Sequence, residues 1–318
     1  MRLFKLALVA GTFALALAPA SHAQDYKIGY SVFWGTNPYL VTMVAGAKAA
    51  AKEWQAKGVN IDLLVTNGGD TDTARQVSDL EDLYAQGVKG VLIFPGDSVM
   101  IGDTVTNVFN AEKIPVVITD IGIRSGDYVS QIVTDNYAGG RQAGDYMAHH
   151  LPKGSKVVTL DNAPTSDNGQ ARQRGFEDAA REAGLVVLAE RIVPTLTLDS
   201  ARRAAEDLLV ADPDVKGIFT LNQLILQGAY QVIDQAGRDG DITLTAFDVD
   251  PISYKMVLDG KIDALVVQDP YRMGYDGMNS MIVSLEGGTV DKNVDLHTRL
   301  LTRENVETFA SDPQIAAN

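Results

Sequence analysis

The segment QGVKGVLIF, residues 86–94, is similar to a later segment of the chain, DVKGIFT, residues 214–220. Each is an apolar run of strand length, and roughly thirty residues beyond each one a second apolar run ends in an aspartate. These second runs are VVITD, which ends at Asp120, and TLTAFD, which ends at Asp248. The repeat predicts two similar α/β halves. Because ligands of open α/β sheets bind at the carboxyl ends of the strands, it also predicts a cleft between the halves.

Apolar runs alternate with longer amphipathic stretches along the whole chain, as they do in parallel sheets built from strand–helix units. In the first half we predict strands at 27–33, 61–65, 88–94, 116–119 and 129–134, a helix from Asn37-Pro38 to Gly58, and helices at 73–86 and 98–111. In the second half we predict helices at 138–150, 170–183, 200–210 and 224–235 and strands at 156–160, 186–192, 217–220 and 242–247. Helices at 252–258 and 271–285 and strands at 264–267 and 298–302 complete the chain. The fold class is therefore α/β, with two Rossmann-like parallel-sheet lobes.

The first residues have the pattern of a secretion signal. Arg2 and Lys5 give a positive start, residues 6–18 are apolar, and Ser21-His22-Ala23 places small residues where a signal peptidase cuts. The apolar run is too short for a membrane anchor, which takes about 20 residues, and no cysteine follows it to carry a lipid. We expect residues 1–23 to be a signal peptide, with cleavage after Ala23 and export to the periplasm.

Composition excludes several classes of function. The sequence has no cysteine, which removes disulfides, thiolate catalysis and cysteine-based metal sites. Its net charge of −14 disfavours a nucleic-acid partner, because an acidic surface repels phosphates. Walker-type, Gly-x-Ser-x-Gly and Gly-x-Gly-x-x-Gly motifs are absent from the sequence, and adjacent helical histidines such as His149 and His150 point in different directions. We expect a protein without enzymatic activity, cofactor or metal.

Polar and aromatic residues at strand ends and helix starts suit a sugar, which has an apolar face and a rim of hydroxyl groups. Asp120 and Asp248 recur at matching strand ends, and each carboxylate can accept hydrogen bonds from neighbouring hydroxyls. Either aspartate could instead cap the next helix. Tyr39 is the best candidate to stack on the ligand, and Asn37 could serve as a cap, a ligand contact or both.

Further candidates lie in the second half. Arg172 lies near a predicted helix start, where the helix dipole favours anions over cations, and Arg174 competes for the same role. Asn222 and Gln268 follow strand ends, where an amide can contact a ligand or cap a loop. An arginine and two amides beside the two aspartates favour binding over glycoside hydrolysis.

Ordered motifs through the chain strengthen this interpretation. They are Thr36-Asn37-Pro38-Tyr39, Phe94-Pro95-Gly96-Asp97-Ser98, 114–120, Thr134-Asp135-Asn136-Tyr137-Ala138-Gly139-Gly140, Arg172 with Gly175-Phe176, Phe219 with Asn222, Phe247-Asp248, and Asp259-Gly260-Lys261 through Gln268. In this order they resemble the periplasmic ribose-binding-protein family, the pentose and hexose branch of type I periplasmic binding proteins. The similarity extends over nearly all of the mature chain.

The resemblance implies a ligand set, a domain division and a partner. The implied ligand-binding residues are Asn37, Tyr39, Asp120, Arg172, Asn222, Asp248 and Gln268. The implied N-terminal lobe is 24–134 plus 269–292, and the implied C-terminal lobe is 135–268 plus 293–318, joined by a three-segment hinge near Thr134, Gln268 and Lys292. A monomer of this kind captures a monosaccharide or sugar alcohol by hinge closure and delivers it to the membrane permease of an ABC transporter.

Three positions depart from the family pattern. Ile121 stands where ribose binders have an arginine, Leu40 replaces a second aromatic residue, and Gln223 stands where an acidic residue is common. We therefore expect a ligand other than D-ribose, such as a different sugar, a deoxy sugar or a polyol.

Two other functions share this fold class. A sensor would present its closed form to a chemoreceptor or histidine kinase, and a repressor would need an N-terminal DNA-binding helix pair. A signal peptide occupies that place in this chain.

Overall fold

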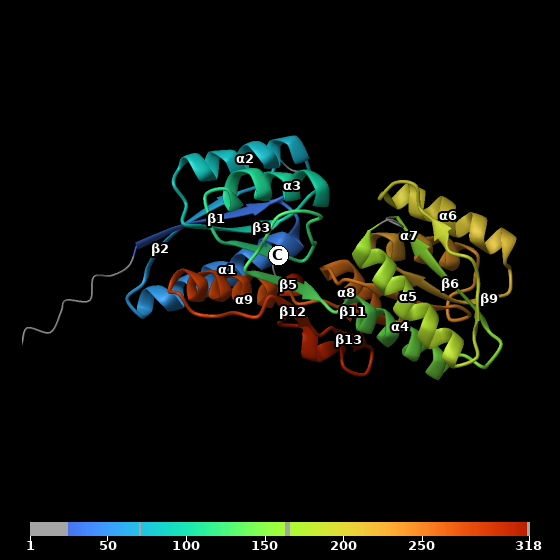
Figure 1. Cartoon of the computed structure of the whole chain (residues 1–318). Helices are drawn as coiled ribbons and strands as arrows, with labels where there is room; N and C mark the ends of the chain where they lie inside the picture. Colours follow the sequence, from blue (N-terminus) through green and yellow to red (C-terminus); the bar gives the residue numbers. More distant parts are fainter. Residues whose placement is uncertain (1–24, 70, 163–165, 317–318) are drawn as a thin grey trace, which may run out of the picture.

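The computed structural model describes residues 25–69, 71–162 and 166–316, and it contains two separate β-sheets (Figure 1). The first sheet has the strand order β12-β5-β4-β3-β1-β2 and is parallel in every pairing. The second has the order β13-β11-β10-β9-β6-β7, and only β13 pairs antiparallel. The predicted α/β class with two Rossmann-like lobes is confirmed. The predicted signal peptide and its cleavage site lie outside the described residues.

The first lobe is a sheet covered by helices on both faces. Its strands are β1 (Asp25–Val32), β2 (Asn60–Thr66), β3 (Gly90–Phe94), β4 (Val116–Thr119), β5 (Ser130–Thr134) and β12 (Asn293–Leu296). Helices α1 (Pro38–Ala56) and α9 (Pro270–Leu285) cover one face, and α2 (Thr73–Ala85) and α3 (Ser98–Thr104), which continues into a π-helical segment (Val105–Asn110), cover the other (Figure 1). Because both faces are covered, the strands read as continuous apolar runs.

The second lobe repeats this plan. Its strands are β6 (Lys156–Asp161), β7 (Val186–Val187), β8 (Arg191–Ile192), β9 (Val215–Thr220), β10 (Thr243–Phe247), β11 (Ala264–Val267) and β13 (Arg299–Thr302). Helices α4 (Asn136–His150) and α5 (Asp167–Glu182) pack on one face, and α6 (Leu198–Ala211), α7 (Gln223–Gln235) and α8 (Pro251–Leu258) pack on the other. A short 3-10 turn (Val306–Phe309) and α10 (Pro313–Ala316) follow β13.

One helix pair in each lobe approaches so closely that only glycine fits at the crossing. A Cβ atom at Gly46 of α1 would lie 1.9 Å from the carbonyl oxygen of Tyr271 in α9. A Cβ atom at Gly175 of α5 would lie 2.1 Å from the carbonyl oxygen of Tyr137 in α4. Both distances are far below van der Waals contact, so these glycines set how deeply each helix pair packs on its sheet.

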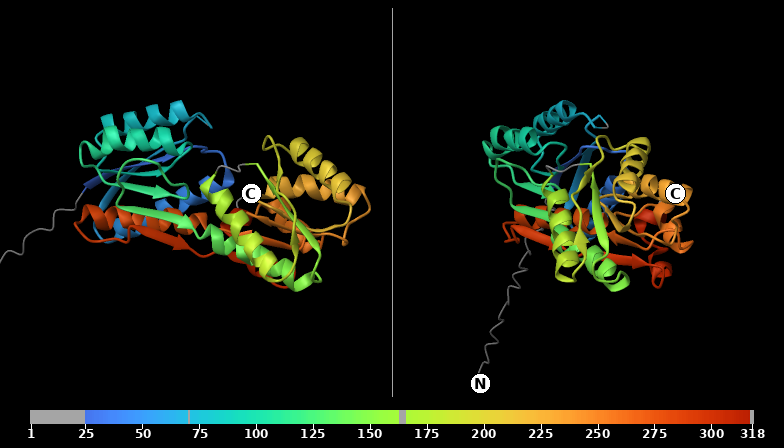
Figure 2. Two further views of the ribbon diagram at one scale, coloured as in Figure 1. Left: turned by 45° about the vertical axis from the view of Figure 1, so that its right-hand side comes forward. Right: turned by 90° about the vertical axis from the view of Figure 1, so that its right-hand side faces the viewer.

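The chain passes between the lobes at three places. It leaves the first sheet after β5 and enters α4, returns from β11 to α9, and passes from β12 to β13. Figure 2 (left) shows the green and red strands running between the lobes. The third crossing was expected near Lys292. Because β12 pairs with β5 from Asn293 to Leu296, the chain leaves the first sheet only after Leu296, which corrects that prediction.

Most predicted elements coincide with observed ones. The predicted strand at 186–192 is two short strands, β7 and β8, both paired with β6. Helix α5 begins at Asp167, before the predicted start at 170, because Ser166 caps it through a hydrogen bond from Gly169 N. Within the described ranges, no helix is both long enough and apolar enough to cross a membrane.

Candidate functional site

The two aspartates that end the repeated apolar runs occupy equivalent places in the two lobes. Asp120 follows β4 and Asp248 follows β10. Asp120 N donates to the carbonyl oxygen of Ile132 in β5 at 2.8 Å, and Asp248 N donates to that of Val266 in β11 at 3.0 Å. Both aspartates have a positive φ, 64° and 69°. Non-glycine residues with such angles are uncommon and cluster at functional sites, so the backbone supports the predicted role of this pair.

A series of close polar contacts through Tyr39 and Gln268 connects the two aspartates. The Tyr39 hydroxyl lies 3.4 Å from Asp120 Oδ1 and 3.4 Å from Gln268 Oε1. Gln268 Nε2 donates to Asp248 Oδ1 at 2.5 Å, and Thr134 Oγ1 donates to Gln268 Oε1 at 2.6 Å. Gln268 lies between β11 and α9, in a segment that connects the lobes. The predicted residues Tyr39, Asp120, Gln268 and Asp248 therefore form one contiguous polar cluster.

Arg172 supplies the positive charge of this cluster. It lies in the second turn of α5, and only 9% of it is exposed. Its Nε donates to Asn136 Oδ1 at 2.8 Å and its Nη1 donates to the carbonyl oxygen of Leu221 at 3.1 Å. Arg174, the competing candidate, is exposed on the same helix. The geometry therefore favours Arg172.

The charges of the cluster act on one another. Burial raises the pKa of the Asp120 carboxyl to about 6; the Arg172 charge opposes this rise and the Asp248 charge adds to it. Burial also raises the pKa of Asp248, again against the charge of Arg172. Burial and the two carboxylates raise the pKa of the Tyr39 hydroxyl well above its ordinary value. The charge of one buried cation thus acts on two buried acids, and these three groups together are net negative when both acids are ionised.

The two predicted asparagines cap helices. Asn37 Oδ1 accepts from Tyr39 N at 2.9 Å at the start of α1. Asn222 Oδ1 accepts from Leu224 N and Ile225 N at the start of α7, and its Nδ2 donates to Asn162 Oδ1 at 2.9 Å. Each oxygen serves its helix, so an asparagine ligand contact would come from the amide nitrogen. In the described part of the chain, neither asparagine side chain hydrogen-bonds to a side chain of the cluster, and their ligand role stays a prediction.

Sequence reasoning missed several residues at this place. Asn136 was quoted only as part of a family motif and Thr134 only in that motif and as a hinge crossing, although Asn136 holds Arg172 and Thr134 holds Gln268. Asn168 was also missed, and its Nδ2 lies 3.4 Å from the carbonyl oxygen of Asp120. Asparagines in the first turn of an α-helix look like caps in a sequence, so only the fold could distinguish them.

Two contacts pass directly between the facing edges of the lobes. Arg124 Nη2 lies 2.9 Å from Asp167 Oδ1 at the start of α5, and Asn168 contacts the Asp120 backbone as described above. Both members of the ion pair are more than half exposed, and such pairs stabilise by at most about 1 kcal/mol. The ion pair therefore contributes little to holding the lobes together.

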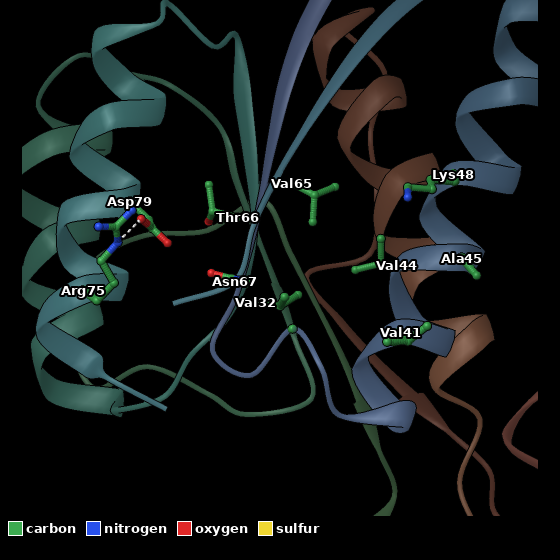
Figure 3. Close-up of a pocket in the computed structure, with 11 residues that line it drawn as sticks. Val32, Val41, Val44, Ala45, Lys48, Val65, Thr66, Asn67, Arg75 and Asp79 are labelled. Atoms are coloured by element: carbon green, nitrogen blue, oxygen red, sulfur yellow. Dashed lines mark hydrogen bonds and ion pairs between the residues drawn. The ribbon is translucent and has the colours of Figure 1, made fainter. Parts of the chain in front are cut away.

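A separate cavity of about 580 Å³ lies in the first lobe at the outer strand β2 (Figure 3). Val41, Val44 and Lys48 of α1 line one side, and Arg75 and Asp79 of α2 line the other. None of the predicted site residues lines it. Arg75 and Asp79 are paired with each other at 2.8 Å, so their charges already satisfy one another.

Metal chemistry finds no support in the described parts of the chain, where no group of three or more histidine, cysteine, aspartate or glutamate residues could hold an ion. The cluster at the lobe edges offers instead two carboxylates, a guanidinium, a carboxamide and a phenol. These groups bind neutral hydroxyl groups well, because each can donate to or accept from a hydroxyl.

Comparison with known proteins places the chain among sugar carriers. Residues 28–289 match the sequence family described as a periplasmic binding protein domain. The chain is 30% identical over 305 residues to a ribose import binding protein of Salmonella typhimurium, covering 96% of this chain and 100% of that protein. A carbohydrate transporter solute-binding protein from Agrobacterium radiobacter, solved with D-arabinose, is 31% identical with a TM-score of 0.76, covering 92% and 98% of the two chains. A solute-binding protein from Agrobacterium vitis, solved with D-fucose, is 26% identical with a TM-score of 0.75, covering 91% and 98%.

Proposed function

This chain belongs to the family of periplasmic binding proteins, and from that premise we propose that it is the substrate-binding component of an ABC transporter for a monosaccharide or sugar alcohol. The ligand binds between the two lobes and is delivered to the membrane permease. The proposal includes the periplasm as the place of action, a single chain as the working unit, and binding without chemical conversion of the ligand.

The observation that carries the proposal is the position of the acid pair. Asp120 belongs to the first lobe and Asp248 to the second, and the charge of Arg172, also of the second lobe, acts on both carboxyls. A ligand that contacts both carboxylates therefore contacts both lobes. Such a ligand stabilises the closed arrangement, because only that arrangement completes its hydrogen bonds.

The chemistry of the cluster supports a polyhydroxylated ligand. Ionised carboxylates accept hydrogen bonds from neighbouring hydroxyl groups, and these charge-assisted bonds are stronger than neutral ones. Water excluded from a closed site strengthens them further, because the local dielectric falls. The solved relatives bound to D-arabinose and D-fucose agree with this ligand class.

Catalysis lacks support in the same geometry. In a glycosidase one carboxyl acts as acid and the other as base or nucleophile, on opposite sides of the scissile bond. Here Arg172 lies within electrostatic reach of both carboxyls and Gln268 donates to one of them, which favours two carboxylates that hold a ligand in place.

A thermal-shift screen over pentoses, hexoses, deoxy sugars and polyols tests the proposal. A ligand that binds the folded state raises the melting temperature. At a concentration one hundred times its Kd, it adds about 2.7 kcal/mol to the free energy of unfolding. At least one compound should do so with the wild-type protein and should raise the melting temperature less with Asp120→Ala. Asp62→Asn, a change at an exposed aspartate of β2, should respond like the wild type. Absence of any shift across the whole screen would contradict the proposal.

A further inference from the structure

Arg172 is a buried cation, and a buried charge requires partners that fix its position. Within the described residues its guanidinium has two hydrogen-bond acceptors, Asn136 Oδ1 and the carbonyl oxygen of Leu221. An arginine has five N–H donors in a planar fork, so fixing Nε and one Nη1 donor also fixes the direction of the remaining donors. These remaining donors are the ones available to a ligand.

The flat face of the guanidinium rests on an aromatic ring. Arg172 Cζ lies 4.0 Å from the ring centroid of Phe247, the residue before Asp248. The ring reaches this position because Gly139 of α4 has no side chain: a Cβ atom there would lie 2.4 Å from Phe247 Cζ. The next residue, Gly140, allows α4 to approach α5 at Arg172 itself, where a Cβ atom would lie 2.0 Å from the Arg172 carbonyl oxygen.

Asn136 joins this arrangement to the segment that connects the lobes. Its side chain is buried, with 7% exposed, and makes two hydrogen bonds in opposite directions. Oδ1 accepts from Arg172 Nε at 2.8 Å, and Nδ2 donates to the carbonyl oxygen of Thr134 at 3.0 Å. Thr134 in turn holds Gln268, which donates to Asp248. A single amide thus connects the arginine of one lobe to the last residue of a strand in the other.

From these contacts we propose that Asn136 is a positioning residue, which holds the Arg172 guanidinium toward Asp120 and Asp248 from the connecting segment at Thr134. Its effect on ligand affinity rests on the function proposed above. Its effect on the arginine does not, because that contact joins two residues of the chain itself.

The experiment follows the charge of Arg172 through its effect on Asp120. The titratable or charged groups that act on the Asp120 carboxyl are Arg172, Asp248 and Tyr39. Carboxyl titration by NMR in the ligand-free protein, labelled at aspartate, gives the pKa of Asp120 in the wild type and in Asn136→Ala. Arg172→Met removes the charge and gives the largest expected rise in the pKa of Asp120. Arg174→Met removes an exposed charge of the same helix and serves as the matched control.

We expect Asn136→Ala to raise the pKa of Asp120 most of the way to its value in Arg172→Met, and Arg174→Met to leave it unchanged. Asn136→Ser should give the same rise as Asn136→Ala, because the serine oxygen lies one bond closer to the backbone than Oδ1 and does not reach Nε. This second variant keeps a polar side chain at the start of α4 and serves if the alanine variant does not fold.

The sugar found in the thermal-shift screen provides the second measurement. Asn136→Ala should lower its affinity about tenfold, the effect of losing one well-aligned charged hydrogen bond, and should move the pH midpoint of binding upward. A pKa of Asp120 that is the same in Asn136→Ala and the wild type, or that Arg172→Met does not raise, would overturn the proposal. If no sugar binds the wild type, the proposed function fails, and the titration alone still decides the role of Asn136.

Discussion

Asp120 and Asp248 share one backbone conformation at equivalent strand ends, with φ angles of 64° and 69° and an N–H that donates to the neighbouring strand of its own sheet. A left-handed conformation costs most non-glycine residues roughly 1–2 kcal/mol, and aspartate adopts it more readily than they do because its short side chain can hydrogen-bond locally. The same conformation at equivalent strand ends supports the proposal that the pair is one ligand-binding device present in both lobes.

The acid pair gives the first prediction. Asp120→Ala and Asp248→Ala should each weaken binding of the screened sugar by about 1.5–3 kcal/mol, because each removes charge-assisted hydrogen bonds to hydroxyl groups. Isothermal titration calorimetry measures the change.

Asp120→Gly separates the side chain from the strained backbone. It should lose affinity as Asp120→Ala does, yet it should be more stable than the alanine variant by about 1 kcal/mol, because glycine adopts a positive φ without strain. Wild-type affinity in both alanine variants would contradict the assignment of the pair.

Stability should depend on pH through Asp120. Its folded pKa is raised from 3.8 to about 6, so its contribution to stability is fully present below pH 4 and is lost as the pH rises through 6. Asp120→Asn removes the free-energy cost of holding this buried carboxyl ionised above its pKa. Without ligand it should therefore be more stable than the wild type at pH 7, by an amount of the order of 1–3 kcal/mol, and the difference should vanish near pH 4.

Thermal melts between pH 4 and 8 measure this difference. Asp62→Asn, at an exposed position, should show no comparable trend. A wild type more stable than Asp120→Asn at pH 7 in the absence of ligand would reverse the sign and contradict the account.

The two arginines of α5 give a matched comparison. Arg172→Ala should weaken sugar binding by about 1.5–3 kcal/mol, because a buried charged donor is lost. Arg174→Ala should leave the affinity within about 0.5 kcal/mol of the wild type, as expected for an exposed residue away from the site. Calorimetry on both variants shows which of the two arginines contributes to sugar binding. Equal losses would show that the charge of the helix, and not the position of Arg172, matters.

Ile121 gives a prediction about ligand identity. An isoleucine beside Asp120 offers no donor, where an arginine would offer five. D-Ribose should therefore bind at least about tenfold more weakly than the best sugar or polyol of the screen. Calorimetry with D-ribose checks this. An affinity in the nanomolar to low micromolar range would show that this position does not discriminate.

The repeated strands and the acid pair were predictable from the sequence, because apolar runs buried on both faces are continuous and their ends mark the sheet edge. The choice between Arg172 and Arg174 was not predictable from the sequence. It depends on which way each side chain leaves α5, and on a helix start that Ser166 moves to Asp167.

The third crossing was misplaced for a similar reason. Asn293–Leu296 contains two polar residues among four and is too short for alternation to be recognised, so only its pairing with β5 reveals that it belongs to the first sheet. Asn136 was missed as a site residue because its partner, Arg172, lies 36 positions away in the sequence. Contacts of this kind follow from the glycine-mediated packing of α4 on α5, which a single sequence does not display.

Small-angle X-ray scattering tests the central claim most directly, which is that a sugar binds between the lobes and holds them together. Tyr39 and Asp120 lie in the first lobe and Arg172 and Asp248 in the second, so the site is complete only when the lobes meet. The radius of gyration of the wild-type protein should fall when the screened sugar is added at saturation, and Asp248→Ala at the same sugar concentration should show a smaller fall, because its affinity is lower. An unchanged radius in the wild type at saturating sugar would contradict closure of the two lobes around the ligand.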